Sequence, residues 1–105
     1  MGGEIFYDRV PPQNLEAEQA VLGAVLLQSE ALISVMERID TEDFYDKSHQ
    51  LIYEAMVNLG EENQPIDLIT LTSLLQDRGQ LEDIGGVSYL AKLANAVPTA
   101  ANVDY

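Results

Sequence analysis

His49 is the residue whose type is best suited to acid–base or metal chemistry near neutral pH, and it is the only histidine of the 105-residue chain. A zinc site would need further nitrogen or sulfur ligands, and the sequence has no cysteine. A lone histidine on the apolar side of a helix is usually a hydrogen-bonded core residue. We therefore predict that His49 belongs to the core and that the chain holds no metal.

Carboxylates are the next groups that could do chemistry, either as acid–base pairs or as calcium ligands. Glu61 and Glu62 are adjacent, and Asp43 and Asp46 are three residues apart. A calcium loop needs a glycine and several oxygen ligands at fixed positions, and neither pair has that spacing. We interpret these acids as helix caps and solvated surface. Since the one histidine is assigned to a helix face, no serine or threonine has a partner for a triad, and we expect no catalytic residue.

Nucleotide binding would require a glycine-rich phosphate loop that ends in Gly-Lys. None of the seven glycines is followed by lysine. We therefore expect no ATP, magnesium or other cofactor to bind this chain.

Association with other proteins is the remaining kind of chemistry, and the candidate residues for it are aromatic or lie in a proline-containing arm. Tyr89 is either at the edge of the core or an exposed anchor for a partner, and we favour the core edge. Phe6, Tyr7 and the Pro11-Pro12 pair lie outside the predicted helices, where they either pack on another chain or are disordered. These five residues are the predicted partner-binding set.

The amino-acid composition limits which kinds of partner the protein can bind and where in the cell it is found. Eighteen acids and five bases give a formal net charge of −13, which repels phosphate backbones and argues against direct nucleic-acid binding. The apolar stretches are too short for a membrane span, and the first residues lack the features of a secretory signal. The absence of cysteine agrees with a reducing compartment. We expect a soluble, cytoplasmic protein with no membrane contact.

The stretch from Gln64 to Gly86 carries the signals of a helix start and a helix stop. Asp67 can accept hydrogen bonds from free backbone N–H groups, so we predict a helix that begins at Leu68. Gly79 can take the left-handed conformation that ends a helix, and Gly85-Gly86 lets the chain turn. Four leucines share one face of this helix: Leu68, Leu71, Leu74 and Leu75. A fifth helix follows, with an apolar face made by Val87, Leu90, Leu93 and Val97.

Three earlier helices are predicted from caps and apolar periodicity. They run from Leu15 to Leu27 after Asn14, from Glu30 to about Ile39 after Ser29, and from Lys47 to Leu59 after Asp46, with Gly60 as the stop of the third. An acidic turn before the third helix places Phe44 in the core. The inner face of that helix is His49, Ile52, Met56 and Leu59, with Leu51 and Ala55 alongside. Gly23 in the first helix suggests a close approach of another backbone.

These elements predict an all-α fold, a compact orthogonal bundle of five to six helices in a single domain. Residues 1–8 form a flexible lead, and residues 9–105 form the domain. Pro98 breaks the fifth helix, and Thr99 caps a sixth that has barely begun at Tyr105. We expect this sixth helix to be the truncated start of a longer element.

Several segments, in order and spacing, resemble the N-terminal domain of the DnaB family of bacterial replicative DNA helicases. The longest is RVPPQNLEAEQAVLG, residues 9–23. The others are Asp43–Tyr45, His49-Gln50, Pro65–Leu68, Ile84–Leu90 and Ala96–Val103. The resemblance extends over residues 9–105.

The resemblance implies an all-helical head followed by a helical hairpin, a linker and an ATPase domain that uses ATP and magnesium in the full-length helicase. In the family the N-terminal domains pair and form a collar on the hexamer. The collar receives the helicase-binding domain of primase and, in some lineages, loader proteins. The chain would then be non-catalytic in isolation and would meet DNA only through the full-length hexamer.

Two other functions stay open at this point. One is direct contact with single-stranded DNA, which a basic groove with stacking aromatic residues would support, but Arg9, Arg38, Lys47, Arg78 and Lys92 are scattered along the sequence. The other is a purely structural collar without a docking role. Salt-dependent DNA titration separates the first of these from the helicase assembly and primase-docking function that we favour.

Overall fold

Five α-helices and two short 3-10 turns make up residues 14–96, the part of the chain that the computed structural model describes. Their bounds are α2 Leu15–Leu27, α3 Ala31–Met36, η2 Thr41–Asp43, α4 Lys47–Glu61, α5 Leu68–Asp77, η3 Glu82–Ile84 and α6 Gly86–Ala94. The predicted lead, the arm and the sixth helix lie outside the described residues, as does Val97.

The predicted side-chain caps at the starts of three helices are confirmed. The Asn14 carboxamide oxygen accepts from the Ala17 N–H at 3.1 Å at the start of α2. The Asp46 carboxylate accepts from the Ser48 N–H at 2.7 Å before α4. Asp67 and Thr70 form a reciprocal capping box that begins α5 at Leu68. Each cap satisfies donors that the first helical turn leaves without a partner, so these boundaries follow from local sequence.

The predicted helix from Glu30 to Ile39 is wrong in its length and in its cap. The observed α3 spans Ala31–Met36, and its N-cap residue is Glu30, which makes no side-chain cap hydrogen bond. Asp40 takes an extended backbone conformation because it caps η2 in a capping box with Asp43. The extended backbone at Asp40 cannot continue a helix, and the observed α3 has six residues.

Gly60 does not end α4, contrary to the prediction, because the helix continues to Glu61. The residue in the left-handed conformation is Asn63, with φ 58°. A Cβ atom at Gly60 would lie 2.8 Å from Leu32 Cδ2. Gly60 therefore lets α3 approach α4 closely, and Asn63 provides the helix stop.

The turn signals after α5 are confirmed. Gly79 has φ 71°, Gly85 has φ 106° and Gly86 has φ 77°, all values that favour glycine. Between them, η3 places Ile84 in the core. The leucine face of α5 is confirmed, but its four leucines are not equally buried. Leu71 and Leu75 are fully buried, whereas Leu68 and Leu74 lie at the edge of the core. The next helix, α6, ends at Ala94 and buries Leu90 and Leu93, while Val87 is exposed.

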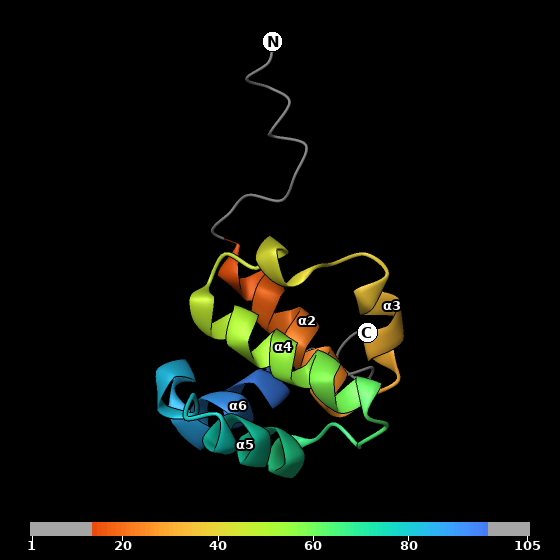
Figure 1. Cartoon of the computed structure of the whole chain (residues 1–105). Coiled ribbons are helices and arrows are strands. Elements are labelled where there is room, and N and C mark those ends of the chain that lie inside the picture. The colour runs from red at the N-terminus through yellow and green to blue at the C-terminus, as the bar shows by residue number, and fades with distance from the viewer. Residues whose placement is uncertain (1–13, 97–105) are drawn as a thin grey trace.

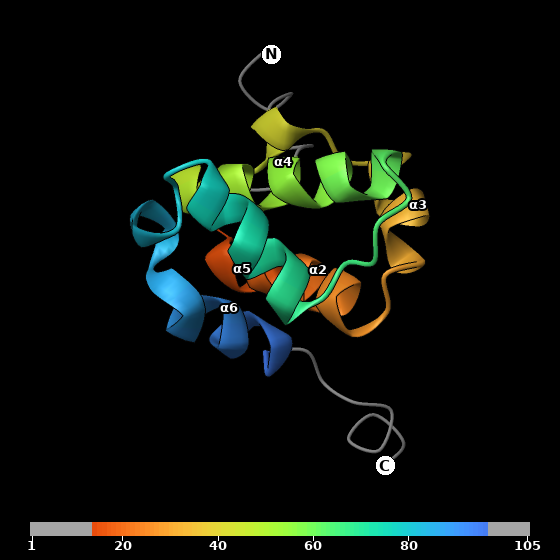
Figure 2. The ribbon, with the colours of Figure 1, turned by 60° about the horizontal axis from the view of Figure 1, so that its bottom comes forward.

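The core lies between α4 and the helices around it. In Figure 1, α4 lies over α2, with α5 and α6 below them and α3 at one end. Figure 2 shows α5 running back across the bundle in front of α2. The buried side chains of α4 are His49, Ile52, Tyr53, Ala55, Met56 and Leu59. Phe44 is buried beside them, as predicted. The all-α fold class is therefore confirmed, and the arrangement brings α2, α4 and α6 together around one polar cluster.

Candidate partner-binding surface

Four polar side chains from three helices form a continuous hydrogen-bonded chain, which we call the polar cluster: Glu18 and Gln19 of α2, His49 of α4 and Tyr89 of α6. A Glu18 carboxylate oxygen lies 2.7 Å from His49 Nδ1. The other imidazole nitrogen, Nε2, lies 2.5 Å from the Tyr89 hydroxyl. Gln19 Nε2 donates to the same hydroxyl at 3.1 Å. The hydrogen bonds of the polar cluster between helices thus join residues that are 31 to 70 positions apart in the sequence.

Glu18 also holds the turn before α4. Its carboxylate accepts from the Tyr45 N–H at 2.7 Å and from the Asp46 N–H at 3.4 Å. Since a carboxylate can only accept, His49 Nδ1 carries the proton of the bond to Glu18. In a neutral imidazole Nε2 then accepts from the Tyr89 hydroxyl, which in turn accepts from Gln19. Every hydrogen-bonding atom of the imidazole has a partner in this arrangement.

The hydroxyl group of Tyr89 points into the interior, and the side chain as a whole is half-buried. Burial raises the pKa of the Tyr89 phenol above its ordinary value of 10.0; the Gln19 hydrogen bond lowers it, and the charges of Asp46 and Glu18 raise it. The Tyr89 ring stacks on the His49 ring at 5.8 Å between centroids and 16° between planes. Lys92 Nζ lies 6.0 Å from the centre of the Tyr89 ring. Tyr89 is therefore at the edge of the core, as favoured from the sequence.

The polar cluster contains residue types that are found in catalytic sites, but a substrate cannot reach them. His49 is 1% exposed, and both of its ring nitrogens are engaged. A general base must reach a substrate proton directly or through one water, and this imidazole faces protein on both sides. The cluster positions three helices, and the prediction that His49 is a satisfied core residue is confirmed.

The other predicted partner-binding residues are not brought together with Tyr89 by the described part of the chain. Phe6, Tyr7, Pro11 and Pro12 all lie outside residues 14–96. Their role in binding stays a prediction, as does that of Tyr89.

Sequence reasoning missed Glu18 and the exposed apolar side chains. Glu18 has the pattern of a first-turn acid, and nothing local distinguishes it from the exposed Glu16. A signal was present in His49 itself, because a buried histidine requires an acceptor from another element. The exposed large apolar side chains are Leu15, Leu27, Ile33, Met36, Tyr45, Ile69 and Val87.

Two kinds of site are absent from residues 14–96. No group of three or more His, Asp or Glu side chains there is arranged to hold a metal ion. None of the helices in the same range combines the length and apolar character that crossing a membrane requires.

Comparison with known families identifies the fold. Residues 10–105 match the model of the DnaB-like helicase N terminal domain. The chain belongs to this family. A crystal structure of the N-terminal domain of DnaB helicase from Mycobacterium tuberculosis superimposes with a TM-score of 0.82 and 46% sequence identity, covering 91% of this chain and 70% of that one. The resemblance drawn from the sequence segments is thereby confirmed.

Two curated relatives show how much of a DnaB-type helicase the chain represents. The replicative DNA helicase DnaC of Bacillus subtilis (strain 168) is 54% identical over 102 residues, and the replicative DNA helicase DnaB of Geobacillus stearothermophilus is 55% identical over 102 residues. Each match covers 97% of this chain and 22% of the relative. The chain therefore spans about a fifth of the length of these relatives and corresponds to their N-terminal domain.

Proposed function

We propose that this chain is the non-catalytic N-terminal domain of a replicative DNA helicase, that it helps to assemble the hexamer collar, and that it docks the helicase-binding domain of primase. The observation that carries the proposal is the match of residues 10–105 to the DnaB-like N-terminal domain. ATP and magnesium act in the motor domain of the full-length helicase. Loader proteins are further partners in lineages that use them.

The chemistry of the described residues supports a role in protein contact. His49 and Glu18 are enclosed in the polar cluster, and the other acids of the described residues cap helices or face solvent. The exposed apolar side chains on α2, α3, α5 and α6 are of the kind that pack on other proteins. A folded head with such a surface suits a docking platform.

The distribution of cations argues against direct binding of single-stranded DNA. Arg38 follows α3, Lys47 begins α4, Arg78 follows α5 as its C-cap, and Lys92 lies in α6. A strand-binding groove needs several cations along one track together with stacking aromatic rings. In our proposal the domain meets DNA only through the full-length hexamer.

Calorimetric titration of the chain with the helicase-binding domain of primase tests the docking function. We expect saturable binding that a primase lacking this domain does not show. No heat at concentrations where full-length helicase binds the same primase domain would contradict docking by this chain. Sedimentation velocity of the chain over a range of concentrations tests self-association separately.

A further inference from the structure

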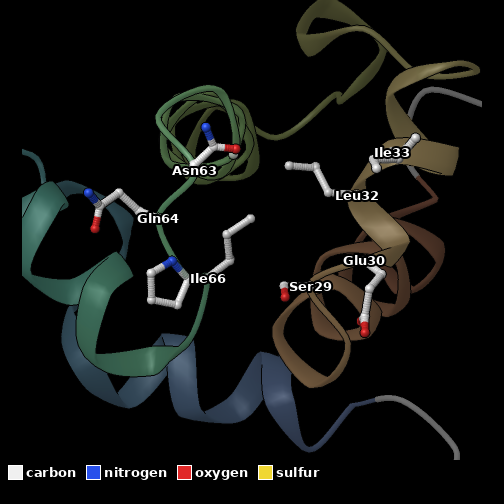
Figure 3. Close-up of a pocket in the computed structure, with 9 residues that line it drawn as sticks. Ser29, Glu30, Leu32, Ile33, Asn63, Gln64 and Ile66 are labelled. Atoms are coloured by element: carbon white, nitrogen blue, oxygen red, sulfur yellow. The ribbon is translucent and has the colours of Figure 1, made fainter.

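A hollow of about 310 Å³ lies between α3 and the connection from α4 to α5. Figure 3 shows Leu32 and Ile66 pointing toward each other across it. Both side chains are buried and form its floor, whereas Ile33 and Pro65 are exposed at its edges. We call this surface the α3 groove and define it by Glu30, Leu32, Ile33, Gly60, Pro65 and Ile66.

The walls of the α3 groove are built by the backbone. Asn63, in its left-handed conformation, donates its N–H to the Gly60 carbonyl at 3.1 Å, and Gln64 donates to the Leu59 carbonyl at 2.9 Å. These two bonds form the Schellman pattern, which directs the chain away from α4 toward Pro65. A Cβ atom at Gly60 would lie 2.8 Å from Leu32 and 3.9 Å from Ile66 and would fill part of the floor. The groove therefore exists before any partner binds.

The groove combines a buried apolar floor with an exposed apolar side chain at its edge. Ile33 is 68% exposed at its edge, directly beside the apolar floor. Ile69 is 79% exposed but does not line the groove. A single exposed apolar side chain needs no explanation, whereas one that continues into an apolar hollow indicates a binding surface.

The charge around the groove is negative. Glu30 lines it, and the exposed pair Glu61 and Glu62 directly precedes Asn63 in its wall. The C-terminal end of α4 borders the groove at Gly60 and adds partial negative charge. No lysine, arginine or histidine lines the groove, and Arg38 lies beyond the end of α3. A partner that fits must bring apolar side chains and positive charge together.

We propose that the α3 groove binds a basic amphipathic helix of a partner protein. Apolar side chains of that helix contact Leu32, Ile33 and Ile66, and its lysines or arginines face Glu30, Glu61 and Glu62. This combination of apolar anchors at helical spacing with complementary charge at the rim is how helices bind preformed grooves. The inference rests on the geometry and charge of the groove and does not depend on primase docking.

The probe is a synthetic peptide of about 15 residues, long enough to form a helix, with leucines on one face and lysines on the other. Titration followed by amide chemical shifts is performed with the unmodified chain, with Ile33→Ser and with Ile69→Ser. Both substitutions replace exposed side chains, so both variants fold. We expect shifts centred on the groove, affinity about tenfold or more weaker for Ile33→Ser, and unchanged affinity for Ile69→Ser.

A peptide of the same composition with leucines and lysines scrambled controls for charge alone. Equal affinity of the two peptides, equal affinity of the two variants, or shifts spread over the whole acidic surface would overturn the proposal. No binding of the amphipathic peptide would overturn it as well. Dimerisation of the chain that Ile33→Ser abolishes would assign the groove to a second copy of the chain instead.

Discussion

Glu18 joins α2 to α4 and to the turn before it, because its carboxylate accepts hydrogen bonds from Tyr45, Asp46 and His49. The role of His49 could be predicted from the sequence because a lone histidine on an apolar helix face has few alternatives. The role of Glu18 could not, because its partners lie 27 to 31 residues away and appear only when α2 packs against α4.

Replacing Glu18 with glutamine should destabilise the domain by about 1–3 kcal/mol. Three donors converge on the carboxylate, and the amide group of glutamine would turn a donor toward them. The matched control is Glu16→Gln, an exposed acid in the same first turn of α2, which reproduces the loss of helix-dipole interaction alone. Urea denaturation of both variants measures the difference. Equal losses of unfolding free energy would show that the polar cluster contributes nothing.

Alkaline pH should destabilise the domain through the ionisation of Tyr53 and Tyr89. Burial raises the pKa of Tyr53 above its ordinary value of 10.0, with further increases from Asp40 and Asp43, and burial likewise raises the pKa of Tyr89. The unfolded chain then loses these protons at lower pH than the folded one. The stabilisation is complete below about pH 10 and is lost as the pH rises toward the folded-state pKa values.

Denaturant unfolding at a series of pH values from neutral to strongly alkaline checks this expectation. The decline above about pH 10 should be smaller in Tyr53→Phe than in the unmodified chain, because the variant removes one of the titrating groups. The same decline in both proteins would assign it to other groups.

The helix starts could be predicted more reliably than the helix ends. Asn14, Asp46 and Asp67 cap helices through hydrogen bonds to backbone N–H groups two or three residues later, so the local sequence determines each of these boundaries. The end of α3 at Met36 is followed by the separate turn that Asp40 caps, and α4 continues past Gly60 to Glu61, where Gly60 lies close to Leu32. A glycine signals either a stop or a close approach, and tertiary packing decides which one applies.

The glycines at 79 and 85 should respond differently to alanine. At Gly79 a Cβ atom meets nothing within 4 Å, so Gly79→Ala carries only backbone strain, about 1–2 kcal/mol. At Gly85 the same atom would lie 2.8 Å from Tyr89 Cβ, which cannot move without shifting α6, so we expect about 3 kcal/mol or more. Thermal denaturation of both variants gives the comparison. A smaller loss for Gly85→Ala would mean that α6 does not hold its position.

The leucine face of α5 allows a matched test of the core. Leu71→Asp should abolish cooperative unfolding, because it places an unpaired charge at a fully buried position. Ile69→Asp, two residues away on the exposed face, should leave the transition within about 0.5 kcal/mol of the original. Circular dichroism during heating distinguishes the two outcomes. A normal transition for Leu71→Asp would refute the orientation of α5.

At the scale of the whole molecule, the all-α class and the helicase family could both be reached from sequence, because helical periodicity, caps and several long segments agree. The binding surfaces could not. The α3 groove lies between α3 and the connection from α4 to α5, two segments far apart in the sequence, and Gly60 allows them to approach beside Leu32. Exposure of Ile33 is likewise a result of packing, since its neighbour Leu32 has the same apolar character and is buried.

We propose that this domain works through contact with protein and not with DNA. The most direct measurement is a pair of amide chemical-shift titrations at one moderate salt concentration, one with the helicase-binding domain of primase and one with a single-stranded DNA oligonucleotide. We predict saturable shifts on one contiguous face with the primase domain and none with the DNA. Micromolar or tighter DNA binding that weakens with salt, together with no shifts from the primase domain, would contradict this proposal.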